Sequence, residues 1–149
     1  MKIEGRFDVN APRAEVWDKV RDPAVMAQCI PGCEDIEEQG DDAYRAVVAV
    51  KVGPIKARFN LLVEVLEELP PHTVISRTSG DEGTRASVVT SENRLTLTET
   101  ATGTQVDYMA DVSVTGRLGK FGLGIFRKKA DQMAATFVDN FSKHLEVSA

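Results

Sequence analysis

Two cysteines, Cys29 and Cys33, lie four positions apart in the stretch CIPGC. Thiols this close can bind zinc, act as a redox pair or form a disulfide. Zinc would need further ligands, and the two histidines of the chain, His72 and His144, are distant in the sequence. The spacing also differs from the C-x-x-C redox motif. We therefore expect a structural bend here, with a disulfide and a metal site as the alternatives.

Residue patterns for catalysis are sparse in the rest of the chain. The sequence contains no G-x-S-x-G elbow, phosphate-binding loop, dinucleotide fingerprint or H-E-x-x-H motif. No carboxylate falls on a clear inward position, so no general acid–base pair can be named. We expect both histidines at the surface. The sequence predicts no catalytic residue and no metal ligand, and it gives no reason to assert an enzyme.

Composition limits the class of protein. The 149 residues fit one domain, 1–149, and 42% of them are hydrophobic against 28% charged. A net charge of −5 argues against a general nucleic-acid binder. No apolar run approaches the roughly 20 residues of a membrane span, and the first residues alternate in polarity, unlike a secretory signal. These features predict a cytoplasmic protein, with peripheral membrane attachment left open.

Charge is unevenly distributed along the chain. Residues 34–42 contain acidic side chains and no basic one, and we expect a solvated surface there. Residues 116–129 contain no acid, and their basic side chains are interleaved with apolar ones and glycines. Such a segment is either plain surface or a contact for a membrane or a partner protein. Its basic residues are Arg117, Lys120, Arg127, Lys128 and Lys129.

Hydrophobic periodicity predicts an α+β fold. A strand over 3–9 precedes two short helices, the first starting at Pro12 and the second spanning 23–29. About six antiparallel strands follow, among them 44–52, 55–65 and 106–114, and residues 79–83 are expected to form a loop. Apolar residues then recur at helical spacing from Ile125 to Leu145. We expect a curved sheet of about seven strands wrapped on this long C-terminal helix.

Small side chains on the inward faces suggest a space between sheet and helix. Ala46, Ala57, Ala86 and Ala110 lie among bulky apolar residues on these faces. Either the core is solid, with bulky neighbours filling the space, or an apolar cavity remains that suits a lipophilic ligand. Polar contacts in such a cavity would come from Tyr44 or Tyr108.

Several stretches together resemble the carbon monoxide dehydrogenase G-subunit family. They are NAPRAEVWDKVRDP, CIPGCEDIE, KVGPIKARFNLLVEVLE and GRLGKFGLGIFRKKADQMAATFVDNF, and the resemblance covers nearly the whole chain. It implies the helix-grip fold of the START-related superfamily, which includes the major birch pollen allergen. It also implies a lipophilic-ligand protein that works beside a molybdenum hydroxylase, in maturation, membrane recruitment or electron transfer.

Three functions follow from these observations. The first is a non-enzymatic carrier of an isoprenoid quinone or lipid, with no covalent cofactor, acting between a molybdenum hydroxylase of the carbon monoxide dehydrogenase type and the inner face of the cytoplasmic membrane. The second is a protein–protein adaptor with an incidental cavity, and the third is a cyclase-like or hydrolase-like enzyme of the same fold. The predicted ligand-binding residues are Met26, Ile30, Tyr44, Ala46, Phe59, Leu61, Tyr108, Ala110, Phe121, Ile125, Met133 and Phe137.

Overall fold

Polar and apolar residues alternate along each long strand, so that one face of the strand points inward. The helices and strands follow one another in nearly the predicted order. The computed structural model describes residues 1–82, 87–116 and 123–148. The elements are β1 (Lys2–Val9), α1 (Arg13–Val20), α2 (Pro23–Cys29), β2 (Cys33–Glu38), β3 (Ala43–Val52), β4 (Ile55–Leu69), β5 (Thr73–Glu82), β6 (Ser87–Glu99), β7 (Thr104–Gly116) and α3 (Leu123–Ser148).

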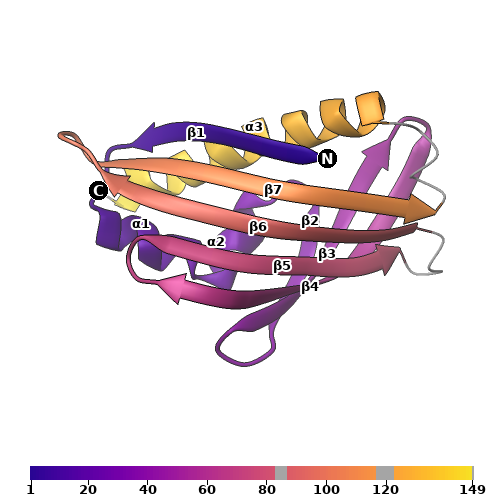
Figure 1. Ribbon diagram of the computed structural model, residues 1–149, viewed down its shortest axis with the longest axis horizontal. Coiled ribbons are helices and arrows are strands. Elements are labelled where there is room, and N and C mark those ends of the chain that lie inside the picture. Colours follow the sequence, from indigo (N-terminus) through magenta and orange to yellow (C-terminus); the bar gives the residue numbers. More distant parts are fainter. Residues whose placement is uncertain (83–86, 117–122, 149) are drawn as a thin grey trace.

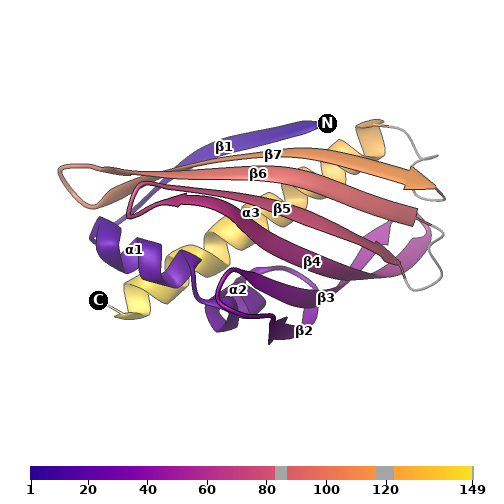
Figure 2. The same cartoon turned by 60° about the horizontal axis from the view of Figure 1, so that its bottom comes forward.

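The strands form one antiparallel sheet of seven strands in the order β1-β7-β6-β5-β4-β3-β2. Strands β2 to β7 pair with their neighbours in the chain, and β1 pairs with β7 at one edge. The sheet curves around α3, which crosses its concave face diagonally (Figures 1 and 2). The predicted α+β helix-grip architecture is confirmed, since the helix has an apolar stripe and the sheet an apolar face to cover.

One prediction about local structure is wrong, and one edge strand was not predicted, although the acidic side chains of residues 34–42 are exposed as expected. Residues 79–82 continue strand β5 instead of forming a loop, because β4 and β6 pair with Gly80 from both sides. The acidic run begins with an edge strand, β2, whose sequence CEDIEE shows little alternation. Arg58 of β4 donates hydrogen bonds to the carboxylate of Glu34 in β2. Pairing with neighbouring strands therefore makes both segments β-strands, although their local sequences do not show a strand pattern.

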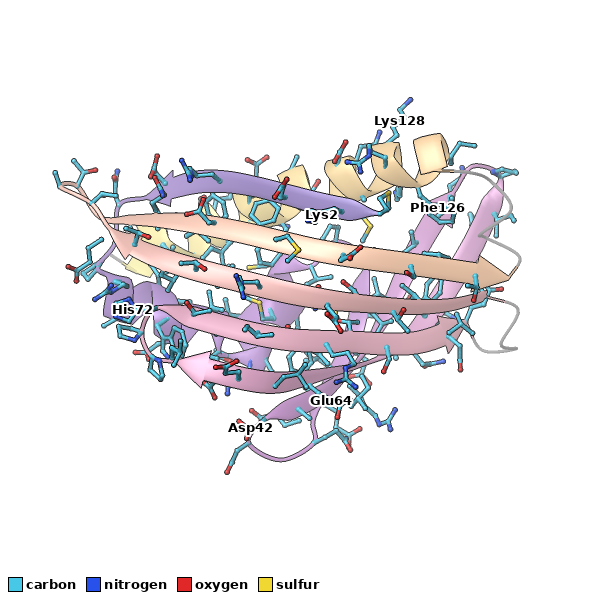
Figure 3. The ribbon with its side chains drawn as sticks, viewed as in Figure 1. Lys2, Asp42, Glu64, His72, Phe126 and Lys128 are labelled. Atoms are coloured by element: carbon cyan, nitrogen blue, oxygen red, sulfur yellow. The ribbon has the colours of Figure 1, made fainter. Side chains whose placement is uncertain are left out.

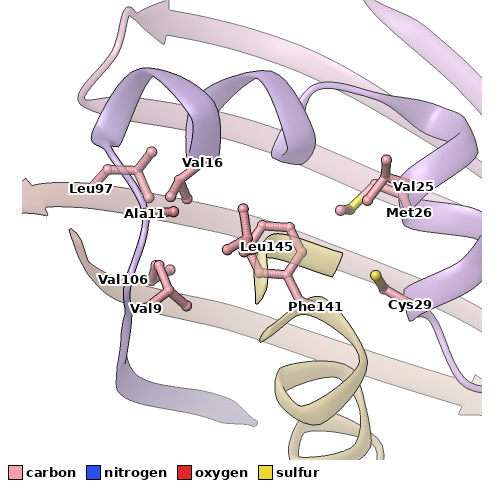
Figure 4. Packing of buried hydrophobic residues seen from close by; sticks show 10 residues of the cluster. All are labelled: Val9, Ala11, Val16, Val25, Met26, Cys29, Leu97, Val106, Phe141 and Leu145. Carbon is pink, nitrogen blue, oxygen red and sulfur yellow. The ribbon is translucent and has the colours of Figure 1, made fainter. Parts of the chain in front are cut away.

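A solid core occupies one end of the molecule. There α1, α2 and the C-terminal part of α3 pack on the sheet (Figure 4). Phe141 and Leu145 of α3 are each 1% exposed, and they contact a cluster to which every neighbouring element contributes. Trp17 of α1 is half-buried and packs against this cluster. The cluster comprises Val9, Ala11, Val16, Val25, Met26, Cys29, Leu97, Val106, Phe141 and Leu145.

The CIPGC stretch is a bend attached to two other elements. Gly32 has a φ of 80°, and a Cβ added there would lie 2.1 Å from the carbonyl oxygen of Ala49 in β3. The Ala49 N–H donates to the Gly32 carbonyl at 2.8 Å. The Asn140 side chain of α3 donates to the Cys29 carbonyl at 3.1 Å. Glycine is needed here both for its left-handed conformation and for the close approach of β3.

The two thiols of this bend are free. Cys29 is fully buried in the core, and Cys33 is half-buried, with its Sγ near the carbonyl of Asp35. Burial raises the pKa of both thiols, so the protonated form dominates at neutral pH. Such thiols are poor nucleophiles and poor metal ligands, and the structural interpretation of CIPGC fits them best.

Replacing Gly32 with alanine should lower stability by more than the same change at Gly40. Both glycines have positive φ, but a Cβ at Gly40 would meet nothing within 4 Å. Gly40→Ala should cost about 1 kcal/mol, and Gly32→Ala clearly more, because the β3 backbone must also move. Thermal unfolding of the two variants measures the difference, at about 2–4 °C per kcal/mol. Equal melting temperatures would contradict the role given to the β3 contact.

Candidate ligand-binding site

A cavity of about 570 Å³ lies between the concave face of the sheet and α3. Side chains from β3 to β7 form its floor, and the inner stripe of α3 forms its roof. Most of its lining is aliphatic or aromatic, and its volume lies within the range of roughly 300–1,000 Å³ found for small-molecule sites. The roof residues are Phe126, Lys129, Ala130, Met133, Ala134, Phe137 and Phe141.

Packing at both ends of the molecule keeps this space open. The large cluster holds the C-terminal part of α3 at one end, and a smaller cluster around Val52, Ala57 and Phe59 lies at the other. Phe126, near the start of α3, packs against the smaller cluster. Between these points, the roof residues Ala130, Met133 and Ala134 are half-buried and line the cavity. The helix is thus supported at two points with a gap between them.

Ten of the twelve predicted ligand-binding residues line the cavity. They come from α2 and the segment after it, from β3, β4 and β7, and from α3. The structure therefore brings together residues as far apart in the sequence as Met26 and Phe137. Their role in binding stays a prediction. These ten are Met26, Ile30, Tyr44, Ala46, Phe59, Leu61, Tyr108, Ala110, Met133 and Phe137.

The start of α3 differs from the prediction. Ile125 is 43% exposed and does not line the cavity, whereas Phe126 does. Position 126 lies on the same helical stripe as Ala130, Met133 and Phe137. Ile125 precedes it by one residue, a rotation of about 100° around the helix axis, so its side chain faces solvent. The remaining predicted positions lie outside the described residues, and these are Ala86, Arg117, Lys120 and Phe121.

Aromatic rings separate the cavity from the solid core. Phe137 stacks on Phe141 with ring centroids 5.7 Å apart, and Phe7 meets Phe141 edge-on at 6.4 Å. Phe7 also contacts Tyr108 at 6.2 Å. The Tyr108 ring lies over Gly5 of β1, where an added Cβ would be 2.3 Å from the hydroxyl oxygen. Glycine in β1 thus leaves room for the ring at the cavity wall.

A polar cluster in the middle of the floor was missed by the sequence analysis. Ser76, Thr78 and Asn93 line the cavity, on the adjacent strands β5 and β6. The Asn93 amide nitrogen is 3.3 Å from the Ser76 Oγ and 3.1 Å from the Thr78 Oγ1. The three side chains belong to segments rich in Ser and Thr, whose inward face is not evident from composition. Only the strand register brings them together.

Tyr44 provides a second polar group at the cavity wall. Its side chain lines the cavity, and desolvation by burial raises its pKa to about 12. Arg21 also lines the cavity, but Glu68 engages its guanidinium through two hydrogen bonds of 3.0 Å. The Tyr44 phenol therefore stays neutral at physiological pH and offers a hydroxyl donor rather than an anion.

Basic side chains surround the first turns of α3. Lys128 projects away from the molecule, on the opposite side of the helix from Phe126 (Figure 3). Arg127 is exposed and donates a hydrogen bond to the Lys2 carbonyl at 2.9 Å, which fastens α3 to β1. Lys129 lines the cavity itself. Cationic groups and the exposed Ile125 thus lie beside the roof of the cavity.

Groups for metal or acid–base chemistry are not assembled in the described parts of the chain. Within residues 1–82, 87–116 and 123–148, no three His, Cys, Asp or Glu side chains lie close enough together to hold a metal ion. His72 is exposed, with its Nδ1 3.0 Å from Arg13. Of the helices that the structure describes, none has the length and hydropathy to cross a bilayer.

Comparison with known proteins identifies a family and a fold. The model of the family described as the G subunit of carbon monoxide dehydrogenase (CoxG) matches residues 5–146. No curated protein gives a significant sequence match. Among solved structures, a conserved protein from Geobacillus kaustophilus is similar, with 25% identity, a TM-score of 0.90 and coverage of 99% of this chain and 97% of that one.

Two further structures share the fold at lower identity. A START superfamily protein from Mycobacterium smegmatis has 14% identity and a TM-score of 0.77, with 99% of both chains covered. The Zhui aromatase/cyclase from a Streptomyces species has 15% identity and a TM-score of 0.72, over 98% of this chain and 93% of that one. One architecture thus occurs in proteins with different descriptions, so function must be argued from the site.

The raised pKa of Tyr44 predicts a pH dependence of stability. The Tyr44 phenol has a pKa of about 12 in the folded state and about 10 when unfolded, because burial disfavours its ionised form in the folded protein. The unfolded chain loses the proton first, so the free energy of unfolding falls as the pH rises from about 10 to about 12. In Tyr44→Phe, it should fall less steeply between these pH values. In a pH titration followed by tyrosinate absorbance, the step near pH 12 should be absent from Tyr44→Phe. Tyr108→Phe, which also lacks one phenol, is the control.

Proposed function

The chain belongs to the CoxG family of carbon monoxide dehydrogenase, and we propose that it is a non-enzymatic binding protein for a lipophilic ligand. The ligand class we propose is an isoprenoid quinone or a similar lipid. The protein would hold it between sheet and helix while serving a molybdenum hydroxylase of the carbon monoxide dehydrogenase type. The family description supports the partner, and the site supports the ligand class.

The observation that carries this proposal is the apolar cavity. Its lining is dominated by Val, Leu, Ile, Phe, Met and Ala side chains, and its volume is about 570 Å³. An apolar ligand gains about 25 cal/mol for each Å² removed from water, and a few polar groups suffice to orient it. A polar metabolite would find few partners here. The chemistry of the lining therefore favours a hydrophobic body with a small polar head.

The polar groups at the cavity favour binding over catalysis. Ser76, Thr78 and Asn93 are neutral, and Tyr44 keeps its proton to about pH 12. Nucleophilic catalysis by a hydroxyl requires a neighbouring base, and acid–base catalysis requires a pKa near the working pH. The described lining residues contain no carboxylate, histidine or cysteine that would supply either.

The basic end of α3 supports a peripheral contact with an anionic membrane. Arg127 and Lys128 are exposed and Lys129 is at the cavity, beside the exposed Ile125. Each such charge near an anionic surface is worth about 1 kcal/mol. A lipid could pass between bilayer and cavity with little exposure to water if this end of the helix faces the membrane. We propose the inner face of the cytoplasmic membrane as this surface.

Protein purified from its own host should contain a lipid. Native mass spectrometry should show an added mass, and solvent extraction should release a quinone or lipid in near-stoichiometric amount. The structural reason is that about 570 Å³ of apolar space does not hold ordered water well. Extracts that repeatedly contain no lipid would count against the carrier and in favour of an adaptor with an incidental cavity.

Two neighbouring alanines of α3 provide a matched test of the cavity. Ala134 lines it, whereas Ala135 is exposed on the outer face of the helix. Ala134→Phe should reduce lipid content at least about tenfold by filling the space, and Ala135→Phe should leave it unchanged. Circular dichroism confirms that both variants fold. A folded Ala134→Phe protein that supports full dehydrogenase activity without lipid would favour the adaptor.

Charge reversal tests the membrane contact. Lys128→Glu with Lys129→Glu should weaken binding to anionic vesicles by at least about tenfold, as expected from about 1 kcal/mol per charge. The control is Lys19→Glu with Lys143→Glu, which changes net charge equally at the opposite end of α3. Cosedimentation with phosphatidylserine vesicles measures both. Equal losses in the two proteins would show a net-charge effect and overturn the assigned surface.

A further inference from the structure

The polar cluster on the cavity floor has a defined hydrogen-bond polarity. The Ser91 Oγ is 2.6 Å from the Asn93 Oδ1, a distance typical of O–H···O bonds and short for N–H···O. The Asn93 nitrogen lies 3.1 and 3.3 Å from the Thr78 and Ser76 hydroxyls, distances that suit an N–H donor. The Asn93 amide therefore directs its oxygen toward Ser91 and its two N–H groups toward Ser76 and Thr78.

This arrangement leaves two unused donors at the cavity. Each hydroxyl of Ser76 and Thr78 accepts one hydrogen bond from Asn93, so its own O–H hydrogen is still available. Neither hydroxyl donates to any of the residues that the structure describes. Asn93, in contrast, has both N–H groups and its oxygen engaged. The floor thus offers donors to a ligand.

The surroundings of the cluster are apolar. In the strand register, Ser76 and Thr78 of β5 lie beside Val65 and Val63 of β4. On the other side, Asn93 of β6 lies beside Ala110 of β7. All of these line the cavity, and β5 is the central strand of the sheet. In an apolar setting an unpaired donor is costly, so a ligand acceptor placed here gains more than it would at the surface.

We infer that the Ser76–Thr78 hydroxyl pair, oriented by Asn93, selects ligands whose polar head carries a hydrogen-bond acceptor such as a carbonyl oxygen. This inference rests on the proposed function and names the ligand class more closely. A quinone carbonyl accepts from the pair without a proton of its own. A quinol presents a phenolic oxygen, which is a weaker acceptor than a carbonyl oxygen, and its own hydrogen can use only the one lone pair that each hydroxyl keeps beside Asn93. The pair therefore favours the oxidised quinone over its quinol.

Binding of three soluble probes tests the selection. The probes are a short-chain naphthoquinone, its naphthoquinol kept reduced under anaerobic conditions, and the matching alkylnaphthalene without oxygen. Lipid-free protein should bind the quinone about tenfold more tightly than either other probe, as one or two net hydrogen bonds imply. Isothermal titration measures all three dissociation constants.

Paired variants assign the preference to the cluster. Ser76→Ala with Thr78→Val removes both donors with little change in volume, and should weaken quinone binding about tenfold while alkylnaphthalene binding is kept or improved. The control is Thr90→Val with Ser113→Ala, the same change on two exposed residues that pair across β6 and β7. Melting curves show that both double variants are folded.

The outcomes separate this inference from the proposed function. If the wild-type protein binds all three probes equally, the donor pair has no selective role and the inference is wrong, while the lipophilic carrier stands. A quinol that binds more tightly than the quinone would show that the hydroxyls accept, and would also overturn it. If no probe and no extracted lipid binds, the proposed function itself fails. Loss of quinone binding in the donor-free variant, with the control variant unaffected, supports the inference.

Discussion

The burial of Phe141 and Leu145 in the solid core determines the position of the whole C-terminal helix. These side chains, each 1% exposed, hold one end of α3 against α1, α2 and the sheet. Asn140 adds a hydrogen bond to the Cys29 carbonyl, so the helix is joined to the CIPGC bend. Because α3 is a rigid rod, fixing this end also fixes the height of the other end above the sheet. The cavity is the space that results.

The residues that line the cavity explain how one site combines apolar packing with selection of a ligand. Apolar side chains supply most of the contact area, and their effect is non-directional. Direction comes from a few neutral groups, Tyr44 among them, each held by its strand neighbours. Of the charged side chains at the wall, Arg21 is paired with Glu68, and Lys129 lies at the basic end of α3. The lining is otherwise almost entirely apolar, which matches a neutral lipophilic molecule better than an ionic one.

Periodicity in the sequence was sufficient for the architecture and for most of the cavity wall. Alternating residues such as Ala46 and Phe59 point inward wherever a strand is regular, so ten lining residues followed from local pattern and family resemblance. The sequence was insufficient where pairing with neighbouring strands determines the local structure. Edge strand β2 forms by pairing with β3, and β5 continues through Gly80 because strands flank it. Asn93 and Ser76 are seventeen positions apart, and only the register makes them partners. The one-residue error at Ile125 reflects the difficulty of locating a helix start from spacing alone.

The uneven burial of α3 also has a consequence for dynamics. Its C-terminal third belongs to the most stable part of the molecule, whereas its first turns rest on half-buried side chains above a cavity. Amide hydrogens should therefore exchange through global unfolding near Phe141 and through local opening of lower free energy near Phe126. Ligand exchange requires only that local opening, since the core at the other end is untouched. The protein can admit or release a bulky molecule while most of its folding free energy is retained.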